Sequence, residues 1–273
     1  MEEEMSRVVD VAAIQALPIG HLLNPENVGH AVDLLKKASA LGVDLACFPE
    51  AYPASGEEEI RRAARELKLF VIASFLVQQG RSLFNESVLI GSEGQVVGRQ
   101  RKVHIVPGIE PFSSGNEYVP METPWGKIGI LICIDGWGFP EGFYQLSRAG
   151  VEMIFNPCLI FKKKPQKKMA LISRVLDYKI PIVAPNNAAW SLKIFPEDPG
   201  MPPEGGQSLI VVPPAYQTHE EIKKFMREAV SCESWIQGEG GKGEEILTAK
   251  IDLFPLKKTR SIWTDCFGGC LLP

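Results

Sequence analysis

Residues 129–135 read GILICID, an apolar run that ends with a cysteine beside an aspartate. A cysteine within an apolar run is most often a small buried hydrophobic side chain with no chemistry of its own. At the carboxyl end of a strand in an α/β sheet, however, it lies where active sites are usually assembled. Cys133 is therefore either a packing residue of the core or a nucleophile, and other parts of the sequence are needed to distinguish the two interpretations.

The composition is ordinary for a globular protein and argues against several classes of partner. The chain has 273 residues, of which 45% are hydrophobic and 23% are charged, and its formal net charge is -4. A weakly acidic chain of this kind is not expected to bind nucleic acid. Three glutamates precede the first apolar stretch, and no apolar run approaches the roughly 20 residues that span a membrane. We therefore expect a cytoplasmic protein without a membrane anchor.

The cysteines and histidines are scattered along the chain, and no two cysteines form a CxxC pair. A structural zinc site needs closely spaced ligands, so the sequence predicts no metal site. The six cysteines are Cys47, Cys133, Cys158, Cys232, Cys266 and Cys270. Most of them are expected to be reduced packing residues.

Short apolar runs alternate with helical patterns, which indicates one α/β domain with mixed sheets over residues 1–273. A hairpin is predicted from two alternating arms at 82–91 and 96–105. Further strands are predicted at 8–15, 43–48, 70–77, 127–134, 151–157, 180–186, 206–214 and 244–253. Helices are predicted at 24–42, 56–68, 140–150, 167–179 and 219–232. A capping box of Ser55 and Glu58 is expected to begin the second helix.

Three polar side chains lie at or near the ends of predicted strands. Glu50 follows the strand 43–48, Lys102 lies in the second hairpin arm, and Cys133 ends the run quoted above. A thiol becomes nucleophilic when a base removes its proton, and a buried carboxylate can be that base. An ammonium group beside both can stabilise an oxyanion.

Two other interpretations of these residues remain open at this point. Glu50 and Lys102 could form surface ion pairs while Cys133 fills the core. Alternatively, a Cys–His protease would pair Cys133 with His104, although no local signature of such proteases surrounds the cysteine.

Three stretches decide in favour of chemistry: LACFPEAYP at 45–53, RKVHIVPGIEPFSSG at 101–115 and GILICIDGWGFPE at 129–141. Together, in this order and spacing, they resemble the signature blocks of the nitrilase superfamily, the carbon–nitrogen hydrolases. The resemblance implies a four-layer αββα sandwich, no metal or organic cofactor, and assembly into homodimers or larger homo-oligomers. It also implies roles for individual residues, with Glu50 as general base, Lys102 as catalytic lysine and Cys133 as nucleophile.

The same resemblance implies a reaction. Cys133 would attack a small non-peptide amide, and a thioester intermediate would then be hydrolysed to the acid, with release of ammonia or an amine. Glu110 would position the substrate or Lys102, and the backbone N–H of Ile134 would help to hold the oxyanion. Trp137 and Cys158 are further candidates for the pocket wall, and each has packing as an equally good explanation.

The branch of the superfamily stays open from sequence. The nitrile-cleaving branch usually follows its cysteine with Trp-Glu, whereas this chain has Ile134 and Asp135, which favours the amidase side. A nitrile hydrolase, an acyltransferase of the same fold and a non-catalytic nitrilase-like binding protein are the alternatives.

Two segments depart from the core pattern. Residues 213–243 replace what is normally a short turn in the superfamily, and we interpret them as an insertion, as a lid or an oligomer contact. The tail 256–273 is apolar for a chain end, so we expect it to dock on its own domain or on a neighbouring subunit.

Overall fold

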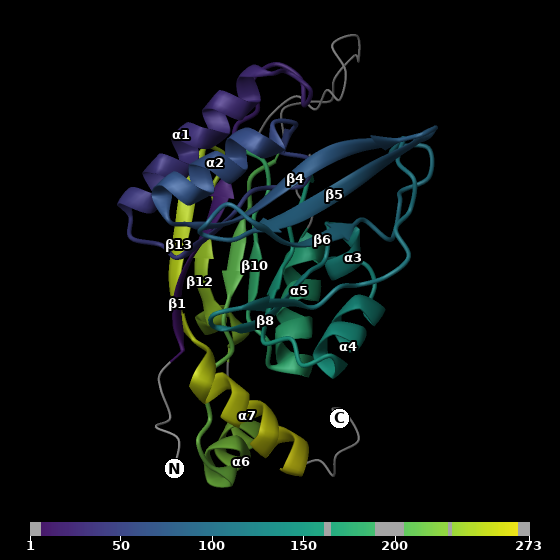
Figure 1. The fold of residues 1–273 in the computed structure, drawn as a ribbon. Coiled ribbons are helices and arrows are strands. Elements are labelled where there is room, and N and C mark those ends of the chain that lie inside the picture. The colour runs from purple at the N-terminus through teal and green to yellow at the C-terminus, as the bar shows by residue number, and fades with distance from the viewer. Residues whose placement is uncertain (1–6, 161–164, 189–204, 229–230, 267–273) are drawn as a thin grey trace.

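Two mixed β-sheets lie face to face in the computed structural model of the chain, which describes residues 7–160, 165–188, 205–228 and 231–266 (Figure 1). In the first sheet β1, β2 and β4 run parallel, and β13, β5 and β6 extend it in antiparallel pairings. Its order is β13 (Glu245–Asp252), β1 (Val8–Gln15), β2 (Leu45–Cys47), β4 (Phe70–Gln79), β5 (Ser82–Ile90) and β6 (Val96–Arg101), with β3 (Pro53–Ala54) beside β4. The predicted hairpin is therefore confirmed as β5 and β6.

The second sheet has a parallel centre of β8, β9 and β10 with antiparallel strands on both sides. Its order is β12 (Ile236–Glu239), β11 (Leu209–Val211), β10 (Ile182–Ala184), β9 (Met153–Phe155), β8 (Gly126–Ile130) and β7 (Met121–Thr123). The carboxyl ends of β8 and β9 lie side by side because the two strands are parallel. Cys133, which follows β8, therefore lies close to the residues that follow β9.

Alternation along β1 shows how the layers form. Val9, Val11 and Ala13 point into the apolar layer between the two sheets. Ala12 and Ile14 point the other way, against α1 (Glu26–Ala40) and α2 (Glu57–Leu67). Successive side chains of a strand face opposite sides, so one strand contributes to two cores.

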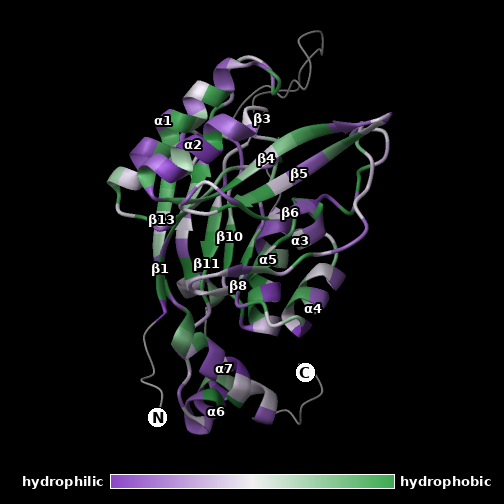
Figure 2. Cartoon of the chain, in the orientation of Figure 1, coloured by the Kyte–Doolittle hydropathy of each residue, from purple (hydrophilic) through white to green (hydrophobic). Residues whose placement is uncertain are grey.

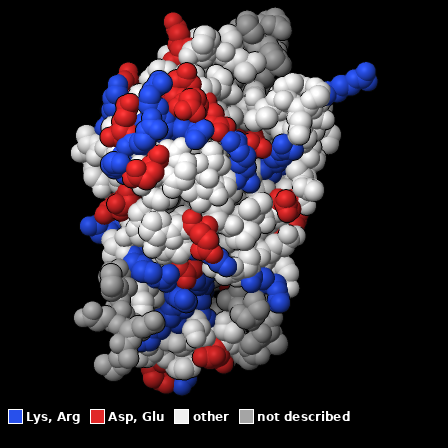
Figure 3. Space-filling model, viewed as in Figure 1, with Lys and Arg blue, Asp and Glu red and all other residues white. Residues whose placement is uncertain are grey.

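The outer face of the second sheet is covered by α4 (Glu141–Arg148) and α5 (Pro165–Tyr178). The order of layers is thus helices, sheet, sheet, helices, and the predicted αββα sandwich is confirmed. The layers differ in hydropathy as expected for this arrangement. In Figure 2 the strands are mostly hydrophobic (green), whereas the outward faces of α1 and α2 are hydrophilic (purple). Acidic and basic side chains lie interspersed on the face shown in Figure 3. Exposed ion pairs of the chain include Lys36–Asp33 and Arg61–Glu58.

The segment 213–243 builds more than a loop. It contains α6 (His219–Arg227), a 3-10 turn at Cys232–Trp235, and β12, which pairs with β11 at the edge of the second sheet. Thr218 and Glu221 form a capping box at the start of α6. Residues 229–230 lie outside the described residues.

The apolar tail begins inside a helix. α7 (Leu253–Cys266) lies next to α6, away from α1 and α2 (Figure 1). Leu256 and Ile262 are buried against the chain's own residues, so this part of the tail docks on its own domain. Residues 267–273 lie outside the described residues. Within the described ranges, no helix is both long and apolar enough to cross a bilayer.

Two local expectations are wrong. The capping box of Ser55 and Glu58 does not form, because Gly56 precedes α2 in a left-handed conformation (φ 77) and no side chain caps the helix. A glycine adopts this conformation without steric cost and can turn the chain into the helix by itself. The strand predicted at 127–134 ends early, at Ile130, and a short helix, α3 (Ile134–Trp137), follows it.

Candidate active site

Cys133 lies in a sharp turn between β8 and α3. Its backbone has φ 50 and ψ -112, a conformation that residues with a side chain rarely adopt. Hydrogen bonds hold the turn on both sides, from the Cys133 N–H to the Pro157 carbonyl at 2.8 Å and from the Gly136 N–H to the Cys133 carbonyl at 3.0 Å. Strain of this kind persists only where the surroundings impose it, and it is frequent at functional sites.

Glu50 follows β2 and is almost completely buried, with 1% of its surface exposed. Its Oε1 accepts from Lys102 Nζ at 2.7 Å and from Asn85 Nδ2 at 2.9 Å, and its Oε2 accepts from the Leu159 N–H at 2.8 Å. Burial and the nearby Cys133 thiol raise the pKa of Glu50 well above its ordinary value, and the Lys102 ammonium only partly offsets this. The carboxyl group is therefore held rigidly and is able to keep a proton.

Lys102 lies just after β6 with no exposed surface, between two carboxyl groups. Its Nζ donates to Glu50 and to Oε1 of Glu110, whose other oxygen accepts from the Val106 N–H at 2.9 Å. Burial would lower the pKa of Lys102, but Glu50, Cys133 and Glu110 outweigh it and raise that pKa. The group is a fixed, buried cation.

The structure brings Glu50, Lys102 and Cys133 together, since Lys102 Nζ lies 2.7 Å from Glu50 Oε1 and Cys133 raises the pKa of both residues. Cys133 is 7% exposed, and both of its charged neighbours are more deeply buried. The interpretation of Glu50 and Lys102 as a surface pair is therefore wrong. Removing an ion pair from water costs free energy unless close geometry and additional hydrogen bonds offset that cost. Here Glu50 also accepts hydrogen bonds from Asn85 and from the Leu159 N–H.

His104 has another role than the one expected in a Cys–His protease. Its ring Nδ1 lies 2.8 Å from Asp135 Oδ1, its Nε2 lies 2.8 Å from Glu141 Oε1, and its ring stacks on Phe139 at 3.9 Å. Asp135 is fully buried and also accepts the backbone N–H groups of Val103 and His104. The histidine therefore joins the segment after Lys102 to the turn after Cys133.

Cys158 follows β9 and has no exposed surface. Its thiol lies in the same apolar cluster as Cys133, and each of the two thiols shifts the pKa of the other. It also donates to Asn156, whose own Nδ2 donates to the Cys133 carbonyl at 2.9 Å. Contact with Cys158 and burial raise the pKa of the Cys133 thiol, although Lys102 acts in the opposite direction.

The two remaining candidates lie in α3, directly after the cysteine. Ile134 begins α3 and is half-buried, and no residue precedes it in the helix to accept its N–H. Trp137 ends α3, is half-buried and packs against apolar layers on both sides of the second sheet. These contacts describe packing, and a pocket role for Trp137 stays a prediction.

Sequence reasoning missed two asparagines that hold the site. Asn85 on β5 donates to Glu50 and is 1% exposed, and Asn156 ties the Cys133 turn to β9 with no exposed surface. A buried amide needs hydrogen-bond partners. An asparagine in an otherwise apolar strand is the signal that could have indicated each of them.

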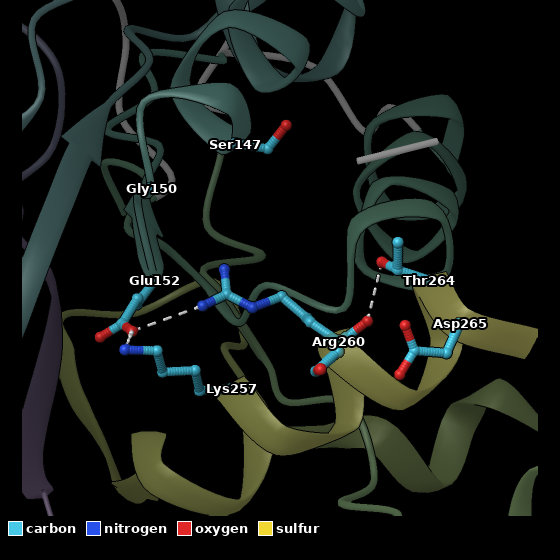
Figure 4. A pocket seen from close by; sticks show the side chains of 8 residues that line it. Ser147, Gly150, Glu152, Lys257, Arg260, Thr264 and Asp265 are labelled. Carbon is cyan, nitrogen blue, oxygen red and sulfur yellow. Dashed lines mark hydrogen bonds and ion pairs between the residues drawn. The ribbon is translucent and has the colours of Figure 1, made fainter. Parts of the chain in front are cut away.

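A separate pocket of about 370 Å³ lies beside α7 (Figure 4). Its buried Glu152 carboxylate already has cationic partners, with Arg7 at 2.6 Å, Arg260 at 3.6 Å and Lys257 at 3.8 Å. None of the residues lining this pocket is among the predicted site residues. We therefore interpret these ion pairs as structural contacts between α7 and the second sheet. Among the described residues no cluster of His, Cys, Asp and Glu is arranged to hold a metal ion.

Comparison with known proteins gives a consistent result. A family model described as carbon–nitrogen hydrolase matches residues 10–260. A nitrilase of Pyrococcus abyssi is 26% identical over 280 residues, covering 93% of each chain. The deaminated glutathione amidase of Homo sapiens is 30% identical over 166 residues, which cover 48% of this chain and 50% of that protein.

Solved structures agree on the fold. The crystal structure of a carbon–nitrogen hydrolase from Helicobacter pylori G27 superposes with a TM-score of 0.78 at 20% identity, covering 96% of this chain and 95% of that one. At this level of identity the likeness shows the shared fold alone.

Proposed function

The chain belongs to the carbon–nitrogen hydrolase family, and we propose that it is an amidase that cleaves small non-peptide amides through a thioester on Cys133. The observation that carries this proposal is the buried Lys102 ammonium held between Glu50 and Glu110 beside a thiol. A surface or packing role does not explain why an amine, two carboxyl groups and a thiol converge there.

In the first half-reaction, Glu50 takes the proton of Cys133 as the sulfur attacks the amide carbonyl. Burial raises the pKa of Glu50, which makes its carboxylate a stronger base than that of an ordinary glutamate, while Cys158 and burial raise the pKa of the Cys133 thiol. Lys102 and the backbone N–H of Ile134 hold the negative charge that develops on the carbonyl oxygen. Losing one such donor typically costs about 10²–10³ in rate.

The tetrahedral intermediate then collapses. Glu50 returns its proton to the leaving nitrogen, ammonia or an amine departs, and the acyl group remains on the sulfur as a thioester. In the second half-reaction Glu50 takes a proton from water, which attacks the thioester and releases the acid. One carboxyl group acts as base and acid in turn, which is effective when its pKa is near the working pH.

An amide is the substrate we favour over a nitrile because the cysteine is followed by Ile134 and Asp135. Asp135 is committed to backbone N–H groups and His104, so it supports the turn and does not take part in the chemistry. The named relatives include both a nitrilase and an amidase, and a nitrile hydrolase is the second candidate. We further propose a homodimer, which sedimentation velocity would reveal by its mass.

The test is direct trapping of the intermediate. The protein is mixed with a panel of small amides, carbamoyl compounds and nitriles, ammonia release is measured, and the quenched protein is weighed by mass spectrometry. An acyl adduct on the peptide with Cys133 and ammonia release from amides are expected. Cys133→Ala should abolish both, whereas Cys47→Ala, which removes a buried thiol that bonds to the Phe48 carbonyl, should keep both. Ammonia release by Cys133→Ala, or no ammonia release by the wild type from any compound of the panel, would rule the proposal out.

A further inference from the structure

Cys133 and Cys158 lie opposite one another across two parallel strands. β8 and β9 pair Ile128 with Met153, Gly129 with Ile154 and Ile130 with Phe155, and each partner lies 25 positions further along the chain. The hydrogen bonds from the Leu131 N–H to Phe155 and from the Cys133 N–H to Pro157 continue this register beyond the strands. Cys133 and Cys158 have the same separation, so they are neighbours at the ends of adjacent strands.

This spacing suits a covalent link between the two sulfurs. Neighbouring strands lie about 4.8 Å apart, within the range of about 4.4–6.8 Å seen between Cα atoms of disulfide-bonded cysteines. Both side chains belong to the apolar layer between the sheets, and each thiol shifts the pKa of the other. The positive φ of Cys133 turns its side chain at a point where the strand has ended. The backbones of the two cysteines therefore already have the separation that a disulfide needs.

The surroundings of Cys158 favour its thiolate form. Burial raises the pKa of this thiol, but the hydrogen bond from Cys133 and the charges of Lys167 and Lys102 outweigh burial and lower it. Lys167 is 4% exposed and holds the Gln207 carbonyl at 3.2 Å, so its charge is fixed near the site. Thiolate is the form that attacks oxidised sulfur.

We propose that Cys133 and Cys158 form a reversible oxidation site, at which a peroxide converts the pair into an intramolecular disulfide. Glu50 takes the proton of Cys133 as the sulfur attacks a peroxide oxygen, the O–O bond breaks, and Cys133 becomes a sulfenic acid while the leaving hydroxide takes that proton and departs as water. The Cys158 thiolate then attacks the Cys133 sulfur, the S–O bond breaks, and the hydroxide that leaves is protonated to a second water. A dithiol reductant reverses the step by thiol–disulfide exchange.

The consequence for activity depends on the proposed function. A disulfide removes the nucleophile, so the oxidised protein is inactive, yet it is protected from further oxidation to sulfinic acid, which cannot be reduced by a dithiol. Cys158 is then the resolving thiol of the site. The matched comparison is Cys47, which is equally buried in the same apolar layer, donates to the Phe48 carbonyl and has a pKa raised by burial alone.

The test uses the whole protein and hydrogen peroxide as the oxidant. After oxidation, free thiols are alkylated and the protein is cut with trypsin without reductant, which places Cys133 in peptide 128–148 and Cys158 in peptide 149–162. These two peptides should be found joined, lighter by two hydrogen atoms than their sum, and dithiothreitol should separate them. Activity should be lost and regained in parallel.

Variants decide whether Cys158 has the resolving role. In Cys158→Ser and Cys158→Ala, peroxide should carry Cys133 to the sulfinic acid, and dithiothreitol should not restore activity. Cys47→Ala should still form the joined peptides. The proposal is overturned if wild-type Cys133 becomes sulfinic while Cys158 is alkylated, if either cysteine pairs elsewhere, or if a Cys158 variant recovers as fully as wild type. Because the peptide measurement needs no substrate, a disulfide in a protein that cleaves no amide would reject the proposed function and leave the oxidation site standing.

Discussion

Asp135 and His104 are joined twice, because Asp135 Oδ1 accepts the His104 backbone N–H at 2.8 Å and also lies 2.8 Å from the ring Nδ1. The other oxygen accepts the Val103 N–H at 3.0 Å. Val103 follows Lys102 in the chain, and Asp135 lies two residues after Cys133. One buried carboxylate thus fixes the segment that bears the ammonium against the turn that bears the thiol.

Asp135→Asn should weaken this connection. The amide replaces one accepting oxygen by a donor, which would face a backbone N–H. We expect the free energy of unfolding to fall by roughly 1–3 kcal/mol and kcat to fall more than KM changes. Urea unfolding and steady-state kinetics on an amide measure the two effects. Asp33→Asn, an exposed carboxylate paired with Lys36, is the control and should change neither; a variant at position 135 as stable and active as wild type would contradict the role.

The raised pKa of Glu50 predicts the acid side of the pH profile. The base must be ionised to accept a proton, so kcat/KM should fall as the pH drops through that raised pKa, well above the ordinary glutamate value of 4.5. Glu50→Gln should remove this limb and lower the rate by about 10²–10⁴. Glu86→Gln, which changes a buried carboxylate held by Arg99 and Arg101, should keep the limb. An acid limb that survives in Glu50→Gln would assign the base elsewhere.

A methyl group at Gly136 should disturb the Cys133 turn. A Cβ there would lie 2.5 Å from Asn156 Nδ2, the amide that holds the Cys133 carbonyl. The amide is buried and bonded, so it cannot move aside cheaply, and Gly136→Ala should lower both stability and kcat. Gly29→Ala is the matched control, because it lies on an exposed position of α1 with open space around it. That change should stabilise the protein by about 0.5–1 kcal/mol, and equal effects of the two changes would refute the argument.

The lowered pKa of Lys179 predicts that its contribution to the free energy of unfolding increases at alkaline pH. Lys179 is 1% exposed, its Nζ lies 3.5 Å from the centre of the Trp263 ring, and burial lowers its pKa to about 8. Between about 8 and the ordinary value of 10.5 the unfolded chain binds more protons than the folded one, so stability contributed by this group rises with pH in that window. Wild type should gain stability relative to Lys179→Met across it, measured by urea unfolding at several pH values. Lys223→Met, an exposed lysine on α6, should show no such trend, and a constant difference for Lys179→Met would refute the linkage.

Glu50 and Cys133 could be singled out from sequence because each follows a short apolar run. Lys102 follows the polar end of a hairpin arm, and the resemblance of its sequence block to the superfamily indicated it. Their supporting asparagines could not be predicted in the same way, because Asn85 and Asn156 meet their partners only through strand pairings between distant segments. Register across a sheet depends on long-range packing, which no local pattern contains.

The shortest secondary-structure elements could not be predicted either. β3 has two residues and α3 has four, which is too few for a period of 2 or 3.6 to be recognised. The interpretation of 213–243 as an insertion did not anticipate that β12 would extend the second sheet. The helix α7 was not predicted; Pro255 lies in its first turn, where proline is tolerated.

The pairing of β1 with β13 has a consequence for biosynthesis. Val8 lies opposite Asp252 and Gln15 opposite Glu245, so β1 leaves the ribosome long before the strand that pairs with this edge of it. Until then the nascent chain presents an open edge that other chains could extend. A chaperone that shields residues 8–15 during translation would meet this need.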